Sequence, residues 1–290
     1  MNRKTKGNTK IERQTSEEEW NQNMDFKRIT SGLIVAVALA IILLIPNNII
    51  TGILFTVIAI IAMNEYLKAI SKVCKPIKWV AYASCIIVAI INYIPKENLT
   101  NILMYSIPTI ILILFAHVIA SDMKITFKDM AYTLLGICYI PVFIMFLSLI
   151  DGMNKGKILL GYVFMASWGT DVFAYCIGKR FGKHKFSKVS PKKSIEGCIG
   201  GTLGATALIL IYTMILNNCF VFEYSYFTVT IFGIVMSLIG QLGDFSASCI
   251  KRYVDIKDYS NLLPGHGGML DRIDSVLFIA PFAYMLFTLI

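Results

Sequence analysis

Long, uninterrupted apolar segments recur along this chain, and they decide what it can fold into. As helices, they are long enough to cross a hydrocarbon core of about 30 Å. They lack the two-residue alternation of barrel strands, and only 16% of the residues are charged. The sequence therefore predicts an all-α polytopic membrane protein with about nine transmembrane helices. We expect the spans at 29–45, 49–66, 77–94, 102–120, 132–150, 158–178, 198–216, 227–243 and 273–290.

The positions of Lys and Arg predict how the spans are oriented, because cytosolic loops carry an excess of these residues. If the N-terminus is cytosolic, 24 of the 27 Lys and Arg residues fall on the cytosolic side and 3 on the other side. This asymmetry indicates nine spans with the C-terminus outside.

Three regions follow from the same pattern. Residues 1–28 are too long and too acidic for a signal-peptide start, and no cleavage site follows them. We interpret them as a polar cytosolic tail. Residues 29–160 are N-terminal transmembrane helices with few polar groups. Residues 161–290 form a C-terminal transmembrane region with nearly every unusual polar group, and we expect it to be catalytic with a cytosolic-facing site.

Several function classes are disfavoured. The seven cysteines show no paired spacing and lie mostly in apolar runs, where they behave as small hydrophobes. No P-loop is present, which disfavours a Walker-type ATPase. Basic residues are tied to the membrane face and are not interleaved with aromatics on a soluble module, so we expect no nucleic-acid partner.

A carboxylate inside the sixth predicted span is the first unusual group. Asp171 lies about two turns from the cytosolic end, and Tyr175 shares its helix face. An ionised group at that depth is costly unless it is paired, hydrated or metal-bound. The simpler alternative is an ion pair between helices, but we favour a functional role.

The loop that follows is strongly basic and ends in SPKKSIEG, residues 190–197. Ser190 is expected to N-cap a helix that begins at Pro191, and Lys192 and Lys193 would make that end a phosphate site. Glu196 opens the seventh predicted span and could pair with a lysine. Next, Gly197 and Gly201 have a spacing typical of close helix packing, which we favour over ligand contact.

The eighth predicted span runs into a second polar group. If its helix continues, the side chains of Asp244, Ser248, Lys251 and Asp255 form one stripe, with Arg252 at its flank. A carboxylate, a hydroxyl and cations in this order can hold a hard metal ion beside a phosphate. A solvated helix end would explain the cations but not Asp244.

The ninth predicted span begins with Asp271, Arg272 and Asp274, after a glycine-rich loop that contains His266, Gly267 and Gly268. Helix capping would need only one of the two carboxylates. Asp244 and Asp271 on two helices, with Asp171 on a third, suit Mg²⁺, which takes oxygen ligands and substrate phosphates. The residues thus predict a metal- and phosphate-handling site at the cytosolic membrane surface, reached laterally by lipid.

The stretch SASCIKRYVDIKDYSNLLPGHGGMLDRID, residues 246–274, resembles the signature of phosphatidate cytidylyltransferases, also called CDP-diacylglycerol synthases. The signature reads S-x-x-K-R-x4-K-D-x-[GS]-x2-[LIF]-P-x-H-G-G-x2-D-R-x-D and is matched without gaps. Residues 171–185 and 190–197 also resemble the family, although Ser194 and Ile195 stand where Thr and Trp are commoner.

The resemblance implies transfer of a cytidylyl group from CTP to phosphatidic acid, giving CDP-diacylglycerol and pyrophosphate, an early step of phospholipid biosynthesis. It implies a nucleotidyltransferase that depends on Mg²⁺, with or without a second cation, and that forms a homodimer among membrane lipids. The expected catalytic residues are Asp271, Asp244, Asp171, Lys251 and Arg252, with Asp244 and Asp271 as metal ligands. The expected substrate- and phosphate-binding residues are Ser190, Lys192, Lys193, Glu196, Ser248, Lys257, His266, Gly267, Gly268, Arg272, Asp274 and Tyr175.

Two other functions are weighed against this one. A polyprenol or dolichol kinase also uses CTP, but it releases CDP instead of pyrophosphate. An ion-coupled transporter would place Asp171 and Asp244 near the midplane, whereas the polar groups gather at one face. A catalytically dead paralogue is disfavoured, because the acidic motif positions are intact. The compact length and the lack of an organellar targeting segment suggest a bacterial cytoplasmic membrane.

Overall fold

The computed structural model describes residues 47–90, 94, 96–187, 189–191, 193–220, 223–262 and 267–289. Within these ranges the regular elements are helices, and pairing of the strand type is limited to isolated bridge residues such as Lys185 and Ser194. The prediction of an all-α fold is confirmed for this part of the chain. The predicted tail 1–28 and the predicted first span 29–45 lie outside the described residues.

The helices follow the apolar segments of the sequence. Among the described residues, five helical stretches are long and apolar enough to cross a membrane: α2, α5 with α6, α7, α8 and α9. Shorter apolar stretches occupy α3 and α4. The chain is thus an integral membrane protein by the length and composition of its helices. The bounds are α2 (Asn48–Ile70), α3 (Lys78–Ile90), α4 (Lys96–Ala120), α5 (Phe127–Tyr139), α6 (Pro141–Asp151), α7 (Gly156–Phe181), α8 (Ile195–Phe220), α9 (Tyr226–Tyr253) and α10 (Leu270–Thr288).

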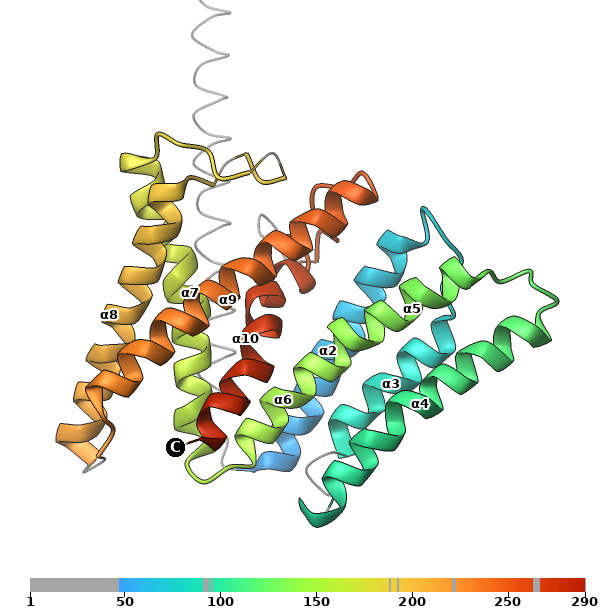
Figure 1. Ribbon diagram of the computed structural model, residues 1–290, viewed down its shortest axis with the longest axis horizontal. Coiled ribbons are helices and arrows are strands. Elements are labelled where there is room, and N and C mark those ends of the chain that lie inside the picture. The colour runs from blue at the N-terminus through green and yellow to red at the C-terminus, as the bar shows by residue number, and fades with distance from the viewer. Residues whose placement is uncertain are drawn as a thin grey trace, which may run out of the picture.

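The predicted span 132–150 is interrupted. It consists of the end of α5 and most of α6, which are separated by Ile140 with φ −102° and ψ −76°. Pro141 is the first residue of α6. Proline has no N–H for the helical ladder, and its ring clashes with the preceding turn, so the helix restarts there. Figure 1 shows α5 and α6 continuing in nearly the same direction.

The helices form two groups with α10 between them (Figure 1). One group contains α7, α8 and α9, and the other contains α2 to α6. The helix α10 contacts α9 and α7 on one side and α6 and α2 on the other. Apart from α5 and α6, successive helices alternate in direction, so the loops after α7 and after α9 lie at the same end of the molecule as the C-terminal end of α2.

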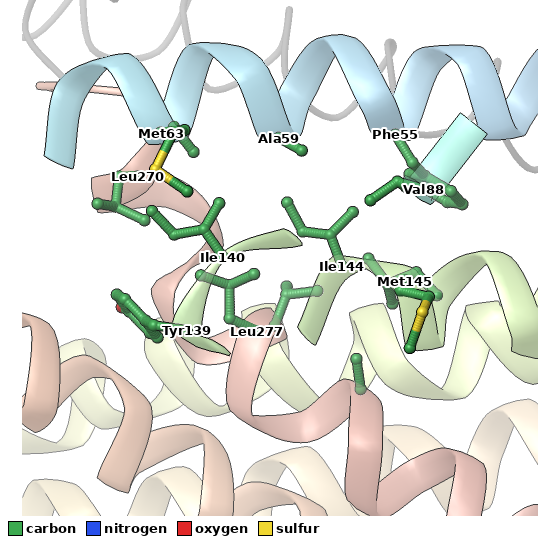
Figure 2. Packing of buried hydrophobic residues seen from close by; sticks show 14 of the residues in the cluster. Phe55, Ala59, Met63, Val88, Tyr139, Ile140, Ile144, Met145, Leu270 and Leu277 are labelled. Carbon is green, nitrogen blue, oxygen red and sulfur yellow. The ribbon is translucent and has the colours of Figure 1, made fainter. Parts of the chain in front are cut away.

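A buried hydrophobic cluster holds α10 in this central place. Figure 2 shows side chains of α2, α6 and α10 converging on one another, among them Met63, Ile144 and Leu277. Large apolar side chains also cover the outside of the helices, for example Ile53 on α2 and Ile211 on α8. Such a surface suits contact with lipid, and the buried cluster fixes the direction in which the start of α10 points.

Candidate active site

A cavity of about 450 Å³ lies where α7 ends, α8 begins, α9 nears its end and α10 begins. Its wall combines carboxylates with cations from several separate stretches of the sequence. The predicted site residues that line it are Asp171, Tyr175, Lys193, Asp244, Asp271, Arg272 and Asp274, and Lys179 and Gln241 join them. The grouping of polar residues from three helices, which the sequence predicted, is thus present in the structure.

Glycines bring two walls of this cavity together. A Cβ atom on Gly197 would lie 2.8 Å from the carbonyl oxygen of Ala174, and one on Gly201 would lie 2.8 Å from that of Thr170. Both distances are too short for real contacts, so only glycine lets α8 approach α7 this closely. The packing interpretation of these glycines is confirmed. The close approach places Asp171 of α7 opposite the start of α8.

Lys193 and Asp244 form an ion pair across the cavity. The Lys193 ammonium also lies 4.7 Å from the centre of the Phe245 ring, and Phe245 stacks on Phe186 at 4.6 Å. Burial lowers the pKa of Lys193, and the negative charges of Asp171 and Asp274 oppose that shift. Lys193 is therefore a cation held at the cavity wall by aromatic and acidic neighbours.

The structure corrects the prediction of a helix cap in the loop before α8. Ser190 does not cap a helix, because α8 begins only at Ile195, and Ser190 instead accepts a turn hydrogen bond from the Lys193 amide (3.1 Å). Ser194 takes the capping role, and its hydroxyl accepts from the amide of Gly197 (3.1 Å). The cap lies further along the chain because the hydrogen bond between Ser190 and Lys193 closes a turn before the helix begins.

Among the described residues, the side-chain partner of Glu196 is His184. Its Oε1 lies 2.7 Å from Nδ1 of His184, and its carboxylate accepts the backbone amides of Lys183 (3.1 Å) and His184 (3.3 Å). The carboxylate therefore closes the basic loop onto the start of α8. In this structure Glu196 organises the loop and does not line the cavity.

Asp271 is buried, with 8% of its surface exposed, and its two oxygens have separate partners. Oδ1 lies 2.7 Å from the ammonium of Lys251. Oδ2 accepts the backbone amides of Tyr259 and Gly268, each at 2.9 Å. Gly267 has φ +82°, a conformation that glycine adopts at little cost. Asp271 thus ties α9 to the glycine-rich loop while it faces the cavity.

Asp274, Asp171 and Arg272 present the remaining charges to the cavity. Asp274 is 5% exposed, and its Oδ1 accepts the Ser275 amide (2.8 Å). The negative charges of Asp171 and Asp274 repel each other, and Lys193 attracts both. Arg272 is exposed and points along the same wall. Two carboxylates that repel each other thus share one cavity with a lysine and an arginine.

The predicted stripe on α9 is shorter than expected. Ser248 and Lys251 lie on the helix, but α9 ends at Tyr253 and Asp255 has φ +52°, outside the helix. Arg252 donates to the carbonyl of Val189 (3.3 Å), so it braces the basic loop. Lys257 and Ser248 do not line the cavity, and Lys257 is exposed. The predicted phosphate contacts of Lys192 and His266 lie outside the described residues.

Sequence reasoning missed two groups of polar residues. Glu65 on α2 is 3% exposed and accepts hydrogen bonds from the start of α10. It belongs to residues 29–160, for which the sequence analysis named no site residue. Its position inside the predicted span 49–66 could have identified it, because an ionisable residue within a span commonly has a functional role. In the cavity wall, Gln241 donates to the hydroxyl of Thr202 (2.9 Å), and a buried chain of hydroxyls continues through Ser237 to Thr170.

The carboxylates of the cavity suit a hard cation that takes its remaining ligands from the substrate. Asp171, Asp244 and Asp274 offer carboxylate oxygens to one cavity, which are the ligands that Mg²⁺ prefers. Among the described residues, however, no cluster of three or more acidic, His or Cys groups is close enough to hold a metal alone. Mg²⁺ commonly uses one or two carboxylates and takes its other ligands from phosphates and water. The residues fit that pattern.

A second, apolar cavity of about 630 Å³ adjoins the polar one between α8 and α9. Cys198 and Gln241 line both cavities. The other walls of the apolar cavity are largely hydrophobic, with Leu203 and Leu238 on the two helices and Phe186 in the loop. An amphiphile with a phosphate head could therefore place its head in one cavity and a hydrocarbon chain in the other.

The comparisons with known proteins agree with this architecture. The family model described as the cytidylyltransferase family matches residues 26–290. A Bacillus subtilis protein named phosphatidate cytidylyltransferase is 36% identical over 62% of this chain and 66% of its own length. Proteins of the same name from Staphylococcus aureus and Thermotoga maritima are 32% and 35% identical, over 86% and 61% of this chain and 94% and 66% of their own lengths.

Proposed function

This chain belongs to the cytidylyltransferase family, and from that premise we propose that it transfers the cytidylyl group of CTP to phosphatidic acid. The products are CDP-diacylglycerol and pyrophosphate, and the enzyme is a nucleotidyltransferase of phospholipid biosynthesis. The observation that carries the proposal is the pair of adjoining cavities, one lined by opposite charges and the other apolar.

The reaction needs little acid–base chemistry from the protein. A phosphate oxygen of phosphatidate attacks the α-phosphorus of CTP, the bond from that phosphorus to the bridging oxygen breaks, and pyrophosphate leaves with the bonding electrons. The phosphate is already ionised, so the main barrier is repulsion between two anions. Lys193 and Arg272 at the cavity wall are placed to neutralise that charge. Lys251 supports the site through its bond to Asp271.

We propose Mg²⁺ as the cofactor, held by Asp244 with Asp171 or Asp274. When bound, it supplies Lewis-acid stabilisation of the phosphate oxygens. Asp244 can act in this way if Lys193 moves from it to a substrate phosphate. The predicted role of Asp271 as a ligand would require its Oδ1 to exchange Lys251 for the metal. Metal titration of the Asp244→Asn variant, followed by the Mg²⁺ concentration for half-maximal rate, tests this assignment.

We propose that an acyl chain of phosphatidate occupies the apolar cavity. The cavity lies between lipid-exposed helices, so a chain can enter from the bilayer without passing through water. The shared residues Cys198 and Gln241 mark the point where the glycerol backbone would pass between the two environments.

We also propose the finer topology: nine spans, a cytosolic N-terminus and a site on the cytosolic side of a bacterial cytoplasmic membrane. The basic loop 182–194 and the site share one end of the helices, as the excess of Lys and Arg on cytosolic loops would require. A homodimer is proposed from the family resemblance. Cysteine labelling from either side of sealed vesicles tests the orientation, and the molar mass in detergent tests the dimer.

The proposed reaction is tested with CTP labelled at the α-phosphate, phosphatidate and Mg²⁺ in membranes that contain the protein. The expected result is label in the lipid phase with stoichiometric pyrophosphate, and loss of both in Asp171→Asn. Release of CDP without labelled lipid would instead indicate a lipid kinase. Absence of any CTP turnover by well-folded protein would refute the proposal.

A further inference from the structure

We infer that Glu65, on a helix far from the catalytic signature in sequence, is a positioning residue for the active site. It acts on α10, which carries Asp271, Arg272 and Asp274, and it does not itself line the cavity. Its catalytic consequence rests on the proposed function, but its structural role can be tested without it.

The carboxylate of Glu65 receives three hydrogen bonds from the segment that leads into α10. Oε1 accepts the hydroxyl of Ser260 (2.6 Å) and the amide of Met269 (3.0 Å). Oε2 accepts the amide of Leu270 (2.8 Å). Only 3% of Glu65 is exposed, so these bonds form with little competition from water and each is charge-assisted.

These bonds provide acceptors for backbone amides at the start of α10. The first amides of a helix have no partner inside the helix, and a side chain at the N-cap normally accepts one of them. In α10 the N-cap position is Met269, which makes no side-chain cap. Glu65 therefore caps α10 from another helix, and its negative charge lies at the positive end of the helix dipole.

The surrounding packing is fitted to this carboxylate. A Cβ atom on Gly268 would lie 2.6 Å from Oε2 of Glu65, so the loop backbone passes directly over it. In Figure 2, Met63 and Leu270 lie close together at the same end of the buried cluster, as contact between α2 and α10 requires. Gly268 is thus explained by this close approach.

Two carboxylates therefore bind described residues on either side of the stretch 263–266. Asp271 binds the amides of Tyr259 and Gly268, and Glu65 binds Ser260, Met269 and Leu270. The start of α10 is fixed from both sides, and with it the direction in which Arg272 and Asp274 enter the cavity. The N-terminal helices consequently contribute to the geometry of the site as well as to the membrane anchor.

The test compares Glu65→Gln with a matched control at the other end of the molecule. Glutamine has the same size but places an NH₂ group where an acceptor is needed. The control is Asp151→Asn, because Asp151 is equally buried (3%) and paired with Lys157 (2.6 Å) at the far end of the helices. Both variants lose a buried carboxylate, but only the first touches α10.

For Glu65→Gln we expect hydrogen exchange at the amides of Met269 and Leu270 to accelerate about tenfold or more, with exchange in α7 and α8 unchanged. We expect kcat per folded molecule to fall about tenfold or more, because small displacements of charged groups are costly in catalysis. For Asp151→Asn we expect a lower melting temperature in detergent and a kcat that changes less than about twofold.

A uniform rise of exchange in Glu65→Gln, with a lower melting temperature and an unchanged kcat, would overturn the inference and make Glu65 a stabilising residue only. If Glu65→Gln does not fold, Ser260→Ala removes one of the three bonds, and the same local exchange and smaller loss of kcat are expected. A wild-type protein without cytidylyl transfer would refute the proposed function, whereas the exchange measurement would still decide the role of Glu65.

Discussion

Replacing Lys193 by methionine removes the positive charge at the centre of the cavity and keeps most of the side-chain volume. In the free protein Lys193 pairs with Asp244 and lies over the ring of Phe245. We propose that it turns to a substrate phosphate when CTP or phosphatidate binds. The variant therefore tests whether this lysine is part of the chemistry or only a charge that orients the loop.

The expected loss of kcat/KM follows from the interactions that Lys193 breaks and forms when substrate binds. A hydrogen bond between charged partners contributes about 1.5–3 kcal/mol when it forms. Lys193 gives up its bond to Asp244 to make the new one, so the lower part of that range applies. About 1.5–2 kcal/mol corresponds to a loss of roughly 10- to 30-fold in kcat/KM.

The assay is the initial rate of label transfer from CTP to lipid in mixed micelles, with each substrate varied in turn. Lys193→Arg should recover part of the loss, because it keeps the charge. Lys124→Met is the control, since Lys124 is an exposed lysine at the same end of the helices and outside the cavity. A loss of less than about threefold, or an equal loss in the control, would refute the reasoning.

Three further variants test other parts of the structure. Asp271→Asn should lower turnover about 100-fold or more while the protein stays folded in detergent, because asparagine cannot accept both loop amides and pair with a lysine; wild-type turnover would remove Asp271 from the mechanism. Gly201→Val should cost about 1–3 kcal/mol of stability, measured as the detergent melting temperature, because its Cβ would press on a backbone carbonyl; an unchanged melting temperature would contradict that packing. Leu203→Trp should raise the KM for phosphatidate roughly tenfold but not that for CTP, with Ile211→Trp on the outer face of α8 as the control; equal effects in both would remove the acyl cavity.

The bodies of the helices could be predicted from the sequence, because a lipid-crossing segment must satisfy its backbone hydrogen bonds internally and be apolar throughout. Their ends could not be predicted as well. Pro141 interrupts a span that is uniformly apolar, and α9 continues past its apolar part to Tyr253. Ser190 was the predicted cap, but the hydrogen bond from the Lys193 amide to the Ser190 carbonyl closes a turn before the helix, and Ser194 caps it instead.

Site residues could be predicted where an unusual polar group stands out within one helix. They could not be predicted where their role comes from a partner far away in the sequence. Asp171, Asp244 and Asp274 lie at the cavity as expected. Glu65 meets Met269 across 204 positions in the chain, and no local pattern encodes that pairing. The partners of Asp271 are backbone amides, whose positions depend on how the glycine-rich loop folds.

The central place of α10 has a consequence for how a newly made molecule becomes active. This helix follows every other element of the site in the chain, so it enters the membrane after them and inserts between two groups of helices that are already present. Until it does so, the carboxylates of α7 and α9 face a site that lacks one wall, and Glu65 has no amides to bind. A chain in which α10 has not yet docked therefore lacks the part of the cavity wall that carries Asp271, Arg272 and Asp274.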